Sequence, residues 1–384
     1  MIKRIGMLSI IFAVCFIFSA VATDTPVIGI LTIPSPVTGH PPGNYSYLPA
    51  SYVKYMESAG ARVIPIPYDA SPENITFLLN QVNGVVFIGG SAKKYIKDPE
   101  TGELLPSNLT IASKLVVDHV LASNAKGENF PLMATCLGWE ILLMCLAGKY
   151  DILYNNYHDK NVKANVQFVP DTKDSKLWNA LTPALQQYSQ QSPAFLYDHV
   201  SAILPGKFRS LKGVNDVLKI TSLSRPVNGG PIFVASAEGR KYPIFGNQFH
   251  PEKNAFEWRE QVDPPHTPES IEIVQRMARM FVKEARKNNR TFINDDVLDG
   301  SLIYNWSPTQ QSLAFMQVYT FRTVIQDPQS WPALFNTTRV QETPVLKTPP
   351  LDRKNIHVQG HATIKLHDIE MLRELPAVEK SISA

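Results

Sequence analysis

The stretch that decides the fold is Pro131-Leu-Met-Ala-Thr-Cys-Leu-Gly-Trp-Glu-Ile-Leu-Leu-Met-Cys-Leu146. Residues 131–135 predict a buried strand, and residues 137–146 predict a helix. A turn of one residue, Cys136, separates the two. A tight strand-to-helix turn lifts its side chain out of the sheet, and the small neighbours Ala134 and Gly138 let the backbone pass close to other strands.

Short apolar runs alternate with helical patterns on both sides of this stretch. The predicted strands are 27–33, 62–66 and 84–88, and the predicted helices are 50–58, 72–80 and 108–123. Helices of this length between buried strands imply crossover connections and a parallel sheet. We therefore expect an α/β fold: a three-layer, doubly wound, mostly parallel sheet of the flavodoxin-like kind, with helices on both faces.

The rest of the chain is less regular. Residues 155–245 look rich in strands, and 232–237 with 242–248 predict a β-hairpin. A further helix carries one apolar face formed by Val274, Met277, Ala278 and Phe281. Beyond Phe321 many prolines interrupt the pattern, which predicts an extension that is partly disordered, with one short helix near 369–375.

Composition excludes several classes of protein. Hydrophobic residues make up 44% of the 384, which is enough for a large core and excludes a wholly disordered chain. The 37 basic and 34 acidic residues leave a net charge of +3, without a concentrated basic tract, so we expect no nucleic-acid partner. Three cysteines are too few for a disulfide scaffold.

The first residues have the parts of a secretory signal. Lys3 and Arg4 precede an apolar run that ends in Ala20-Val-Ala22, a small-residue exit typical of cleavage. The alternative is an uncleaved signal anchor, because the run is nearly long enough to span a bilayer. We expect residues 1–22 to be a signal peptide, 23–321 a catalytic domain and 322–384 the extension, with no membrane association after cleavage.

Six Asn-x-Ser/Thr sequons agree with a secretory route. These candidate glycosylation sites are Asn44, Asn74, Asn108, Asn289, Asn305 and Asn336. Removal of the signal also removes Cys15, so the mature chain keeps Cys136 and Cys145. Cys145 lies within an apolar helix and is expected to be a core residue.

Cys136 is the candidate nucleophile. The N-terminus of the following helix points at its sulfur, which predicts a lowered thiol pKa. The N–H of Leu137 would point where an oxyanion forms. The candidate base is His250, which ends a strand at Pro251, and Glu252 can orient its imidazole. The glycine pair Gly89-Gly90 directly follows a strand and predicts either a bare-backbone site or an ordinary turn.

Together these residues resemble the gamma-glutamyl hydrolase (folate poly-γ-glutamate hydrolase) family, peptidase family C26, in the class I glutamine amidotransferase-like superfamily. The resemblance covers about residues 26–321. The segments that carry it are 50–63, Phe87-Ile-Gly-Gly-Ser91, Thr135-Cys-Leu-Gly-Trp-Glu140, Gln248-Phe-His-Pro-Glu-Lys-Asn-Ala-Phe-Glu-Trp258, 281–289 and 302–308. The chain departs from the family pattern at three positions: Ala134 replaces glycine, Trp139 replaces phenylalanine and Phe249 replaces tryptophan.

The resemblance implies a role for each candidate residue. Cys136 would be the nucleophile, His250 its general base and acid, and Glu252 the residue that orients His250. The backbone N–H groups of Gly90 and Leu137 would form the oxyanion hole, and His199 would line the substrate pocket.

The resemblance also implies a reaction and its partners. The substrates would be folate or antifolate poly-γ-glutamates, cleaved through a thioester with no metal or organic cofactor. It further suggests a homodimer and an extracellular, lysosomal or vacuolar location. Two alternatives are a glutaminase subunit of an amidotransferase and a secreted binding protein that has lost catalysis. The sequence leaves endo and exo cleavage open.

Overall fold

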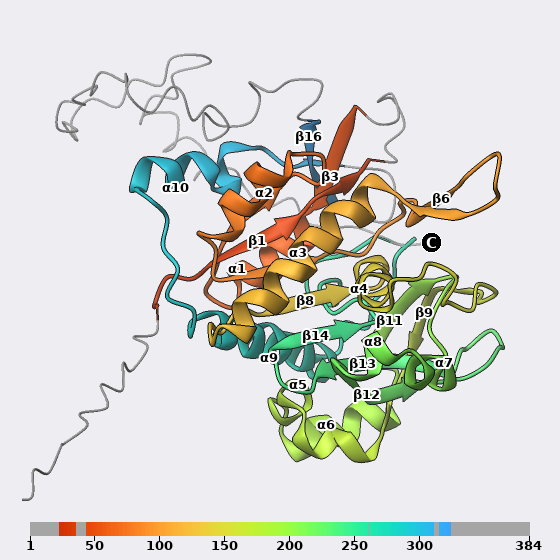
Figure 1. Cartoon of the computed structure of the whole chain (residues 1–384). Helices are drawn as coiled ribbons and strands as arrows, with labels where there is room; N and C mark the ends of the chain where they lie inside the picture. The colour runs from red at the N-terminus through yellow and green to blue at the C-terminus, as the bar shows by residue number, and fades with distance from the viewer. Residues whose placement is uncertain (1–22, 36–43, 260, 311–314, 324–384) are drawn as a thin grey trace, which may run out of the picture. The chain divides into compact units, whose positions relative to one another are not determined.

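The structure, a computed structural model, describes residues 23–35, 44–259, 261–310 and 315–323. Its centre is an eight-stranded sheet (Figure 1). Its strand order is β10-β12-β13-β14-β8-β5-β1-β4. The strands are β1 (Val27–Leu31), β4 (Arg62–Ile66), β5 (Gly84–Phe87), β8 (Leu132–Thr135), β10 (Gln167–Phe168), β12 (Leu218–Ser224), β13 (Phe233–Gly239) and β14 (Ile244–Asn247).

The half of the sheet from β14 to β4 is parallel, and the half from β10 to β14 is antiparallel. The parallel strands are mainly apolar and buried; all five residues of β1 are buried, and in β4 only Arg62 is partly exposed. This is the pattern of strands covered on both faces. The predicted α/β fold with a mostly parallel, doubly wound sheet is confirmed.

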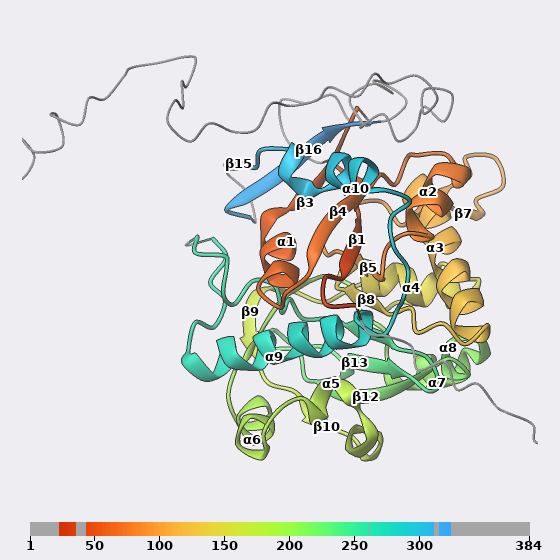
Figure 2. The same ribbon diagram turned by 90° about the vertical axis from the view of Figure 1, so that its left-hand side faces the viewer.

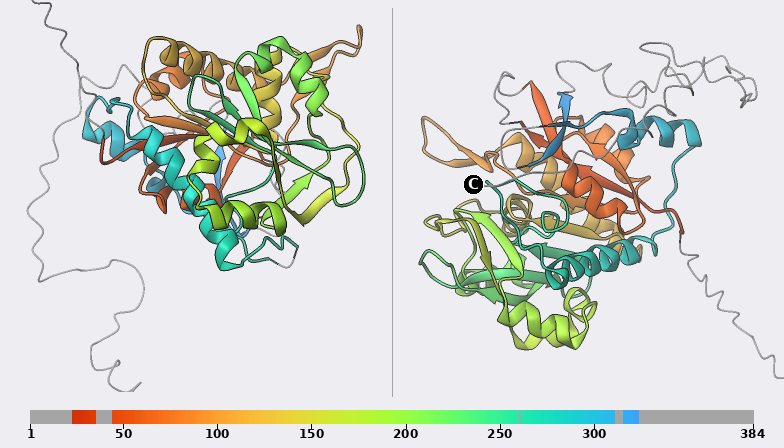
Figure 3. Two further views of the ribbon diagram at one scale, coloured as in Figure 1. Left: turned by 90° about the horizontal axis from the view of Figure 1, so that it is seen from below. Right: turned by 180° about the vertical axis from the view of Figure 1, so that it is seen from behind.

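Two groups of helices cover the sheet. In the view of Figure 1, α3 (Asn108–Ala125) and α4 (Leu137–Ala147) lie in front, and α2 (Pro72–Leu79) packs on α3. From behind, α1 (Ala50–Glu57) and α9 (Pro268–Ala285) lie on the near side (Figure 3). The turned view in Figure 2 separates the two groups. The Tyr55 hydroxyl joins the second group by donating to the Val274 carbonyl at 3.0 Å.

Smaller sheets flank the large one. One has the order β15 (Thr309–Gln310), β16 (Gln317–Arg322), β3 (Tyr45–Pro49) and β2 (Ile33–Pro34). A second pairs β11 (Phe195–His199) with β9 (Asp159–Ala164), and a third is the hairpin of β6 (Tyr95–Lys97) and β7 (Leu104–Pro106). The first two of these sheets supply part of the wall around the site described below.

Most predicted elements are found at the predicted positions. The strand 62–66 is β4, the helix 50–58 is α1, and the hairpin is β13 paired antiparallel with β14. The single strand expected at 27–33 is instead β1 and β2, because β1 pairs with β4 and β5 in the large sheet whereas β2 pairs with β3 in a smaller one.

The middle of the chain contains more helix than the sequence indicated. Its elements are η1 (Pro170–Asp174), α5 (Lys176–Asn179), α6 (Pro183–Gln191), α7 (Pro205–Ser210) and α8 (Lys212–Asn215), and α10 (Asp295–Ser301) with η2 (Ile303–Asn305) follow α9. Most of these helices are too short to show a clear period. Local features start several of them instead: Thr182 caps α6 with its hydroxyl, and proline is the first residue of α6 and α7.

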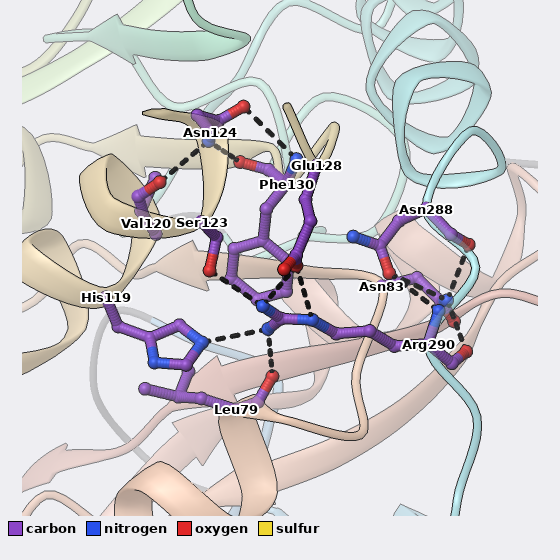
Figure 4. A network of polar contacts seen from close by, with 10 residues as sticks. All are labelled: Leu79, Asn83, His119, Val120, Ser123, Asn124, Glu128, Phe130, Asn288 and Arg290. Carbon is purple, nitrogen blue, oxygen red and sulfur yellow. Dashed lines mark hydrogen bonds and ion pairs between the residues drawn. The ribbon is translucent and has the colours of Figure 1, made fainter. Parts of the chain in front are cut away.

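A polar cluster fixes the segment that follows α9 (Figure 4). The Arg290 guanidinium donates to Glu128 Oε2, to the Leu79 carbonyl at 2.6 Å and to Ser123 Oγ at 2.7 Å. It also lies 2.8 Å from His119 Nε2. Because Leu79 ends α2 while His119 and Ser123 belong to α3, one side chain ties three elements together.

The described residues all belong to the first of two units of the chain, Met1–Thr337. The expected signal, most of the expected extension and the short helix near 369–375 lie outside the described residues, so these domain boundaries stay predictions. Within the described ranges, no helix combines the length and the apolar character needed to cross a membrane.

Candidate active site

Cys136 occupies the turn between β8 and α4, as predicted. Its backbone has φ 49° and ψ −109°, a left-handed conformation that non-glycine residues rarely adopt. The Cys136 N–H donates to the Asn247 carbonyl at 2.8 Å, and the Gly138 N–H donates to the Ile88 carbonyl at 3.0 Å. Backbone strain held in place by the two neighbouring strands is typical of a functional position.

Gly138 shows why a small residue must follow the cysteine. A Cβ atom at this position would lie 2.6 Å from Phe87 Cβ and 2.7 Å from the Phe87 carbonyl oxygen. The start of α4 therefore packs directly on the backbone of β5, and a larger residue would push the turn away.

His250 and Glu252 follow β14 and form a buried pair. His250 Nδ1 lies 2.8 Å from Glu252 Oε1; 3% of the His250 side chain is exposed and none of the Glu252 side chain. The backbone N–H of His250 donates to the Leu196 carbonyl. A carboxylate can only accept a hydrogen bond, so this contact favours the tautomer that carries its proton on Nδ1 and leaves a lone pair on Nε2.

Gly89 lies between the nucleophile and the base. A Cβ atom there would be 2.6 Å from His250 Cε1 and 3.2 Å from Cys136 Cβ. The three residues come from β5, β8 and β14, whose parallel strands end at the same edge of the sheet. The Gly89 N–H donates to the Tyr52 hydroxyl at 2.7 Å, and Gly90 lines the cavity described next, so the bare-backbone site stays a prediction that concerns Gly90.

A cavity of about 560 Å³ opens over this group. Cys136, His250, Gly90 and Leu137 all line it. Leu137 is the first residue of α4, so its N–H has no acceptor within the helix. Gly90 has φ 148°, a conformation that favours glycine.

His199, the weakest of the predictions, ends β11 and also lines the cavity. It is surrounded by the rings of Tyr157, Tyr197 and Phe233, with centroids 4.9–5.8 Å from its own. Burial, followed by the charge of His250, lowers the pKa of His199 to about 4. A neutral imidazole in the wall of the pocket is therefore expected above that pH.

Several charged residues of the cavity were missed by sequence reasoning. Glu140 is buried, with Oε2 2.6 Å from Lys94 Nζ and Oε1 accepting from Gln248. Lys253 is 1% exposed, 3.9 Å from the Asp198 carboxylate and 4.8 Å from the centre of the Phe315 ring. Glu140 and Lys253 stand in the same sequence motifs as Cys136 and Glu252. This closeness in sequence could have identified them as site residues.

Lys160 completes the basic lining. It is exposed, and no ion pair of Lys160 is found within the described ranges. Together with Lys94 and Lys253 it places three ammonium groups around one cavity. No group of three or more His, Cys, Asp or Glu side chains in this described part of the chain is arranged to hold a metal ion.

The predicted lowering of the Cys136 pKa is wrong for the free protein. Burial is the largest effect and raises the pKa of the thiol well above its usual value; the carboxylates of Glu140 and Asp198 raise it further, and Lys253 opposes them. The thiol donates to the Asp198 carbonyl at 3.7 Å. The resting site therefore holds a neutral thiol, and the proton must leave during attack. Cys145 is buried, as expected, and burial raises its pKa to about 12.

The three departures from the family pattern fit the structure. The indole of Trp139 fills the space over Gly246, where a Cβ atom would lie 2.0 Å from the ring. Ala134 stands in register with the same glycine on β14, so its methyl group meets no opposing side chain there. Phe249 packs at 4.3 Å between ring centres with Phe195.

A strained cysteine turn and a buried His–Glu pair meet at one edge of a doubly wound α/β sheet, and the comparisons place this arrangement in a family of hydrolases. Residues 26–252 match the model of the Peptidase C26 family. The chain belongs to this family, that of the gamma-glutamyl hydrolases.

Similar proteins are found in distant organisms. Gamma-glutamyl hydrolase of Glycine max is 36% identical, and the match covers 79% of this chain and 88% of that one. Gamma-glutamyl hydrolase B of Dictyostelium discoideum is 33% identical (78% and 84%), and gamma-glutamyl hydrolase of Homo sapiens is 31% identical (73% and 84%).

Proposed function

We propose that the enzyme hydrolyses the γ-glutamyl amide bonds of folate and antifolate poly-γ-glutamates through a thioester on Cys136. The observation that carries the proposal is the arrangement of Cys136 and His250 around Gly89, beneath a cavity lined by three lysines. Cleavage of a γ-glutamyl bond needs a nucleophile and a base, and a polyanionic chain needs cationic partners.

The reaction begins from the neutral thiol. As the sulfur attacks the γ-carbonyl carbon, a C–S bond forms and the thiol proton passes to His250 Nε2. The carbonyl electron pair moves to oxygen, where the N–H groups of Gly90 and Leu137 stabilise the charge. Glu252 stabilises the imidazolium through Nδ1, at 2.8 Å.

Collapse of the tetrahedral intermediate breaks the C–N bond. His250 returns its proton to the departing glutamate amine, which leaves the acyl group on Cys136 as a thioester. A water molecule then attacks, with His250 as base, and the C–S bond breaks to regenerate the thiol. His250 takes one proton from this water and returns it to the departing sulfur, so each half of the cycle ends with a neutral imidazole.

The lysines are proposed to bind the α-carboxylates of the chain. Lys253 is buried beside Cys136, and its nearest carboxylate, Asp198, is 3.9 Å away, beyond hydrogen-bond distance. A substrate carboxylate would supply the close ion pair that the buried Lys253 ammonium group lacks. Lys94 is already paired with Glu140, so we assign the glutamates farther along the chain to the exposed Lys160.

The test is digestion of pteroyl-pentaglutamate, with products sized over time. We expect release of glutamate or γ-glutamyl peptides by the native enzyme, and less than a few per cent of that rate from Cys136→Ala. Cys145→Ala, at the other buried cysteine, is the matched control and should retain activity. Ammonia release from glutamine, without cleavage of the pentaglutamate, would identify a glutaminase instead. Tight binding without turnover would identify a silent binding protein.

We further propose that the chain enters the secretory pathway, reaches the extracellular space, a lysosome or a vacuole, and carries glycans. Of the sequons, Asn108, Asn289 and Asn305 are exposed, Asn44 and Asn74 are partly exposed, and Asn336 lies outside the described residues. N-terminal sequencing of the mature chain and a mass shift on glycosidase treatment test this route. A homodimer, suggested by the family resemblance, is tested by sedimentation equilibrium.

A further inference from the structure

Tyr52 lies beside the triad, although no step above uses it. It belongs to α1 and is 1% exposed. Its hydroxyl oxygen accepts a hydrogen bond from the Gly89 N–H at 2.7 Å. A Cβ atom on Gly89 would lie 2.9 Å from this oxygen and 2.6 Å from His250 Cε1. The phenol and the imidazole thus contact the same glycine.

The proton of this hydroxyl has an acceptor close by. Glu252 Oε1 is occupied by His250, whereas Oε2 is buried and receives no other hydrogen bond within the described residues. Tyr52 lies within electrostatic range of this carboxylate, because after burial the charge of Glu252 is the largest cause that raises the pKa of Tyr52. Since the Tyr52 oxygen already accepts from Gly89, its O–H is free to donate to Glu252 and so to satisfy a buried charge.

We propose that Tyr52 is a positioning residue that joins the two halves of the catalytic machinery. Its hydroxyl receives the Gly89 N–H and donates to Glu252. This fixes the loop that carries the oxyanion donor Gly90 relative to the His250–Glu252 pair. The inference rests on the proposed function, because it concerns the same reaction, but it assigns Tyr52 no contact with substrate.

A further consequence concerns the oxyanion hole. Because the Gly89 N–H is engaged by Tyr52, the donor from this loop is the next one, at Gly90. Loss of the hydroxyl would free the Gly89 N–H and loosen the loop, and would also remove one hydrogen bond from Glu252. Both effects act on the transition state more than on substrate binding.

The central experiment is Tyr52→Phe, which removes one oxygen and keeps the ring. We expect kcat on pteroyl-pentaglutamate to fall about 10- to 100-fold, the rate equivalent of one hydrogen bond to a charged group, with KM within threefold of the native value. Inactivation by iodoacetamide at pH 7.5 should slow at least fivefold, because alkylation also needs His250 as base. A merely structural role would not move both rates while KM stays constant.

The matched control is Tyr55→Phe. Tyr55 lies on the same helix and is equally buried, and its hydroxyl donates to the Val274 carbonyl of α9 rather than to the triad or to Gly89. Both variants should lose similar free energy of unfolding in urea, but Tyr55→Phe should keep the native kcat. If Tyr52→Phe does not fold, 3-fluorotyrosine at position 52 keeps the hydroxyl and makes it more acidic. A change in kcat larger than twofold at 52 but not at 55 supports the role, and equal effects overturn it.

A double-mutant cycle tests the link to Glu252. In a Glu252→Gln background, Tyr52→Phe should cost less than threefold, because the acceptor has already changed. Losses that multiply fully would overturn the inference, as would a Tyr52→Phe enzyme with native kcat or native alkylation rate. An inactive native enzyme would instead refute the proposed function, so the two failures are distinguishable.

Discussion

Gly89→Ala tests the geometry of the site, because its effect on kcat can be compared with its effect on the free energy of unfolding. Gly89 does not have a positive φ, so alanine can adopt its backbone conformation without strain. The new Cβ atom would lie 2.6 Å from His250 Cε1, and an ordinary contact begins near 3.4 Å, so the imidazole must move by about 0.8 Å. A misplacement of this size costs on the order of 100-fold in rate.

We therefore expect kcat on pteroyl-pentaglutamate to fall about 100-fold, equivalent to about 2.7 kcal/mol. The free energy of unfolding should fall by about 1–3 kcal/mol, the usual cost of one added methyl group in a packed region. Gly206→Ala in α7 is the control, because its Cβ atom would meet nothing within 4 Å. A Gly89→Ala enzyme with kcat within threefold of native would refute the close packing of His250 on Gly89.

Three further predictions follow from the charges. Lys160→Ala should raise KM for pteroyl-pentaglutamate at least threefold more than for the diglutamate, whereas Lys163→Ala on the same strand should not; equal effects on both chain lengths would contradict the assignment. Because burial raises the pKa of Cys136, iodoacetamide inactivation of the free enzyme should be slow at pH 5 and accelerate steadily to pH 8; equal rates at the two pH values would show a preformed thiolate. Burial and the charge of Arg290 lower the pKa of His119 from 6.5 to about 4. As the pH falls, the unfolded chain therefore binds this proton at a higher pH than the folded chain does. The stability that is present above pH 6.5 is lost as the pH falls toward 4. His119→Gln should flatten that loss in urea unfolding at pH 7 and pH 4.5, and an unchanged pH dependence would exclude His119 as its source.

The elbow and the base were predictable because local sequence specifies them. An apolar run, a single cysteine, a glycine and a helical pattern permit few geometries, and β8 and α4 begin within a residue of the predicted positions. His250 and Glu252 are two residues apart, so their contact needs little tertiary information.

The environment of the thiol was not predictable in the same way. The helix N-terminus is visible in the sequence, but the carboxylates of Glu140 and Asp198 approach Cys136 from different elements, and burial depends on the whole cavity. Tyr52 was missed for the same reason. Its position in an ordinary amphipathic helix gives no sign that its hydroxyl reaches a loop 37 residues farther along the chain.

The short helices between residues 170 and 215 mark another limit. Most of them begin at a capping hydroxyl or a proline and are too short to show a repeating apolar face, so a search for periodicity does not detect them.

β14 is the junction between the parallel and antiparallel halves of the large sheet, since it pairs in parallel with β8 and antiparallel with β13. Its Asn247 carbonyl holds the strained backbone of Cys136, and His250 follows three residues later. A nascent chain that has folded only its first half consequently has a nucleophile without support and without a base. Hydrolytic activity is therefore expected only after the second half has docked, so the recovery of activity during refolding reports the rate of that docking step.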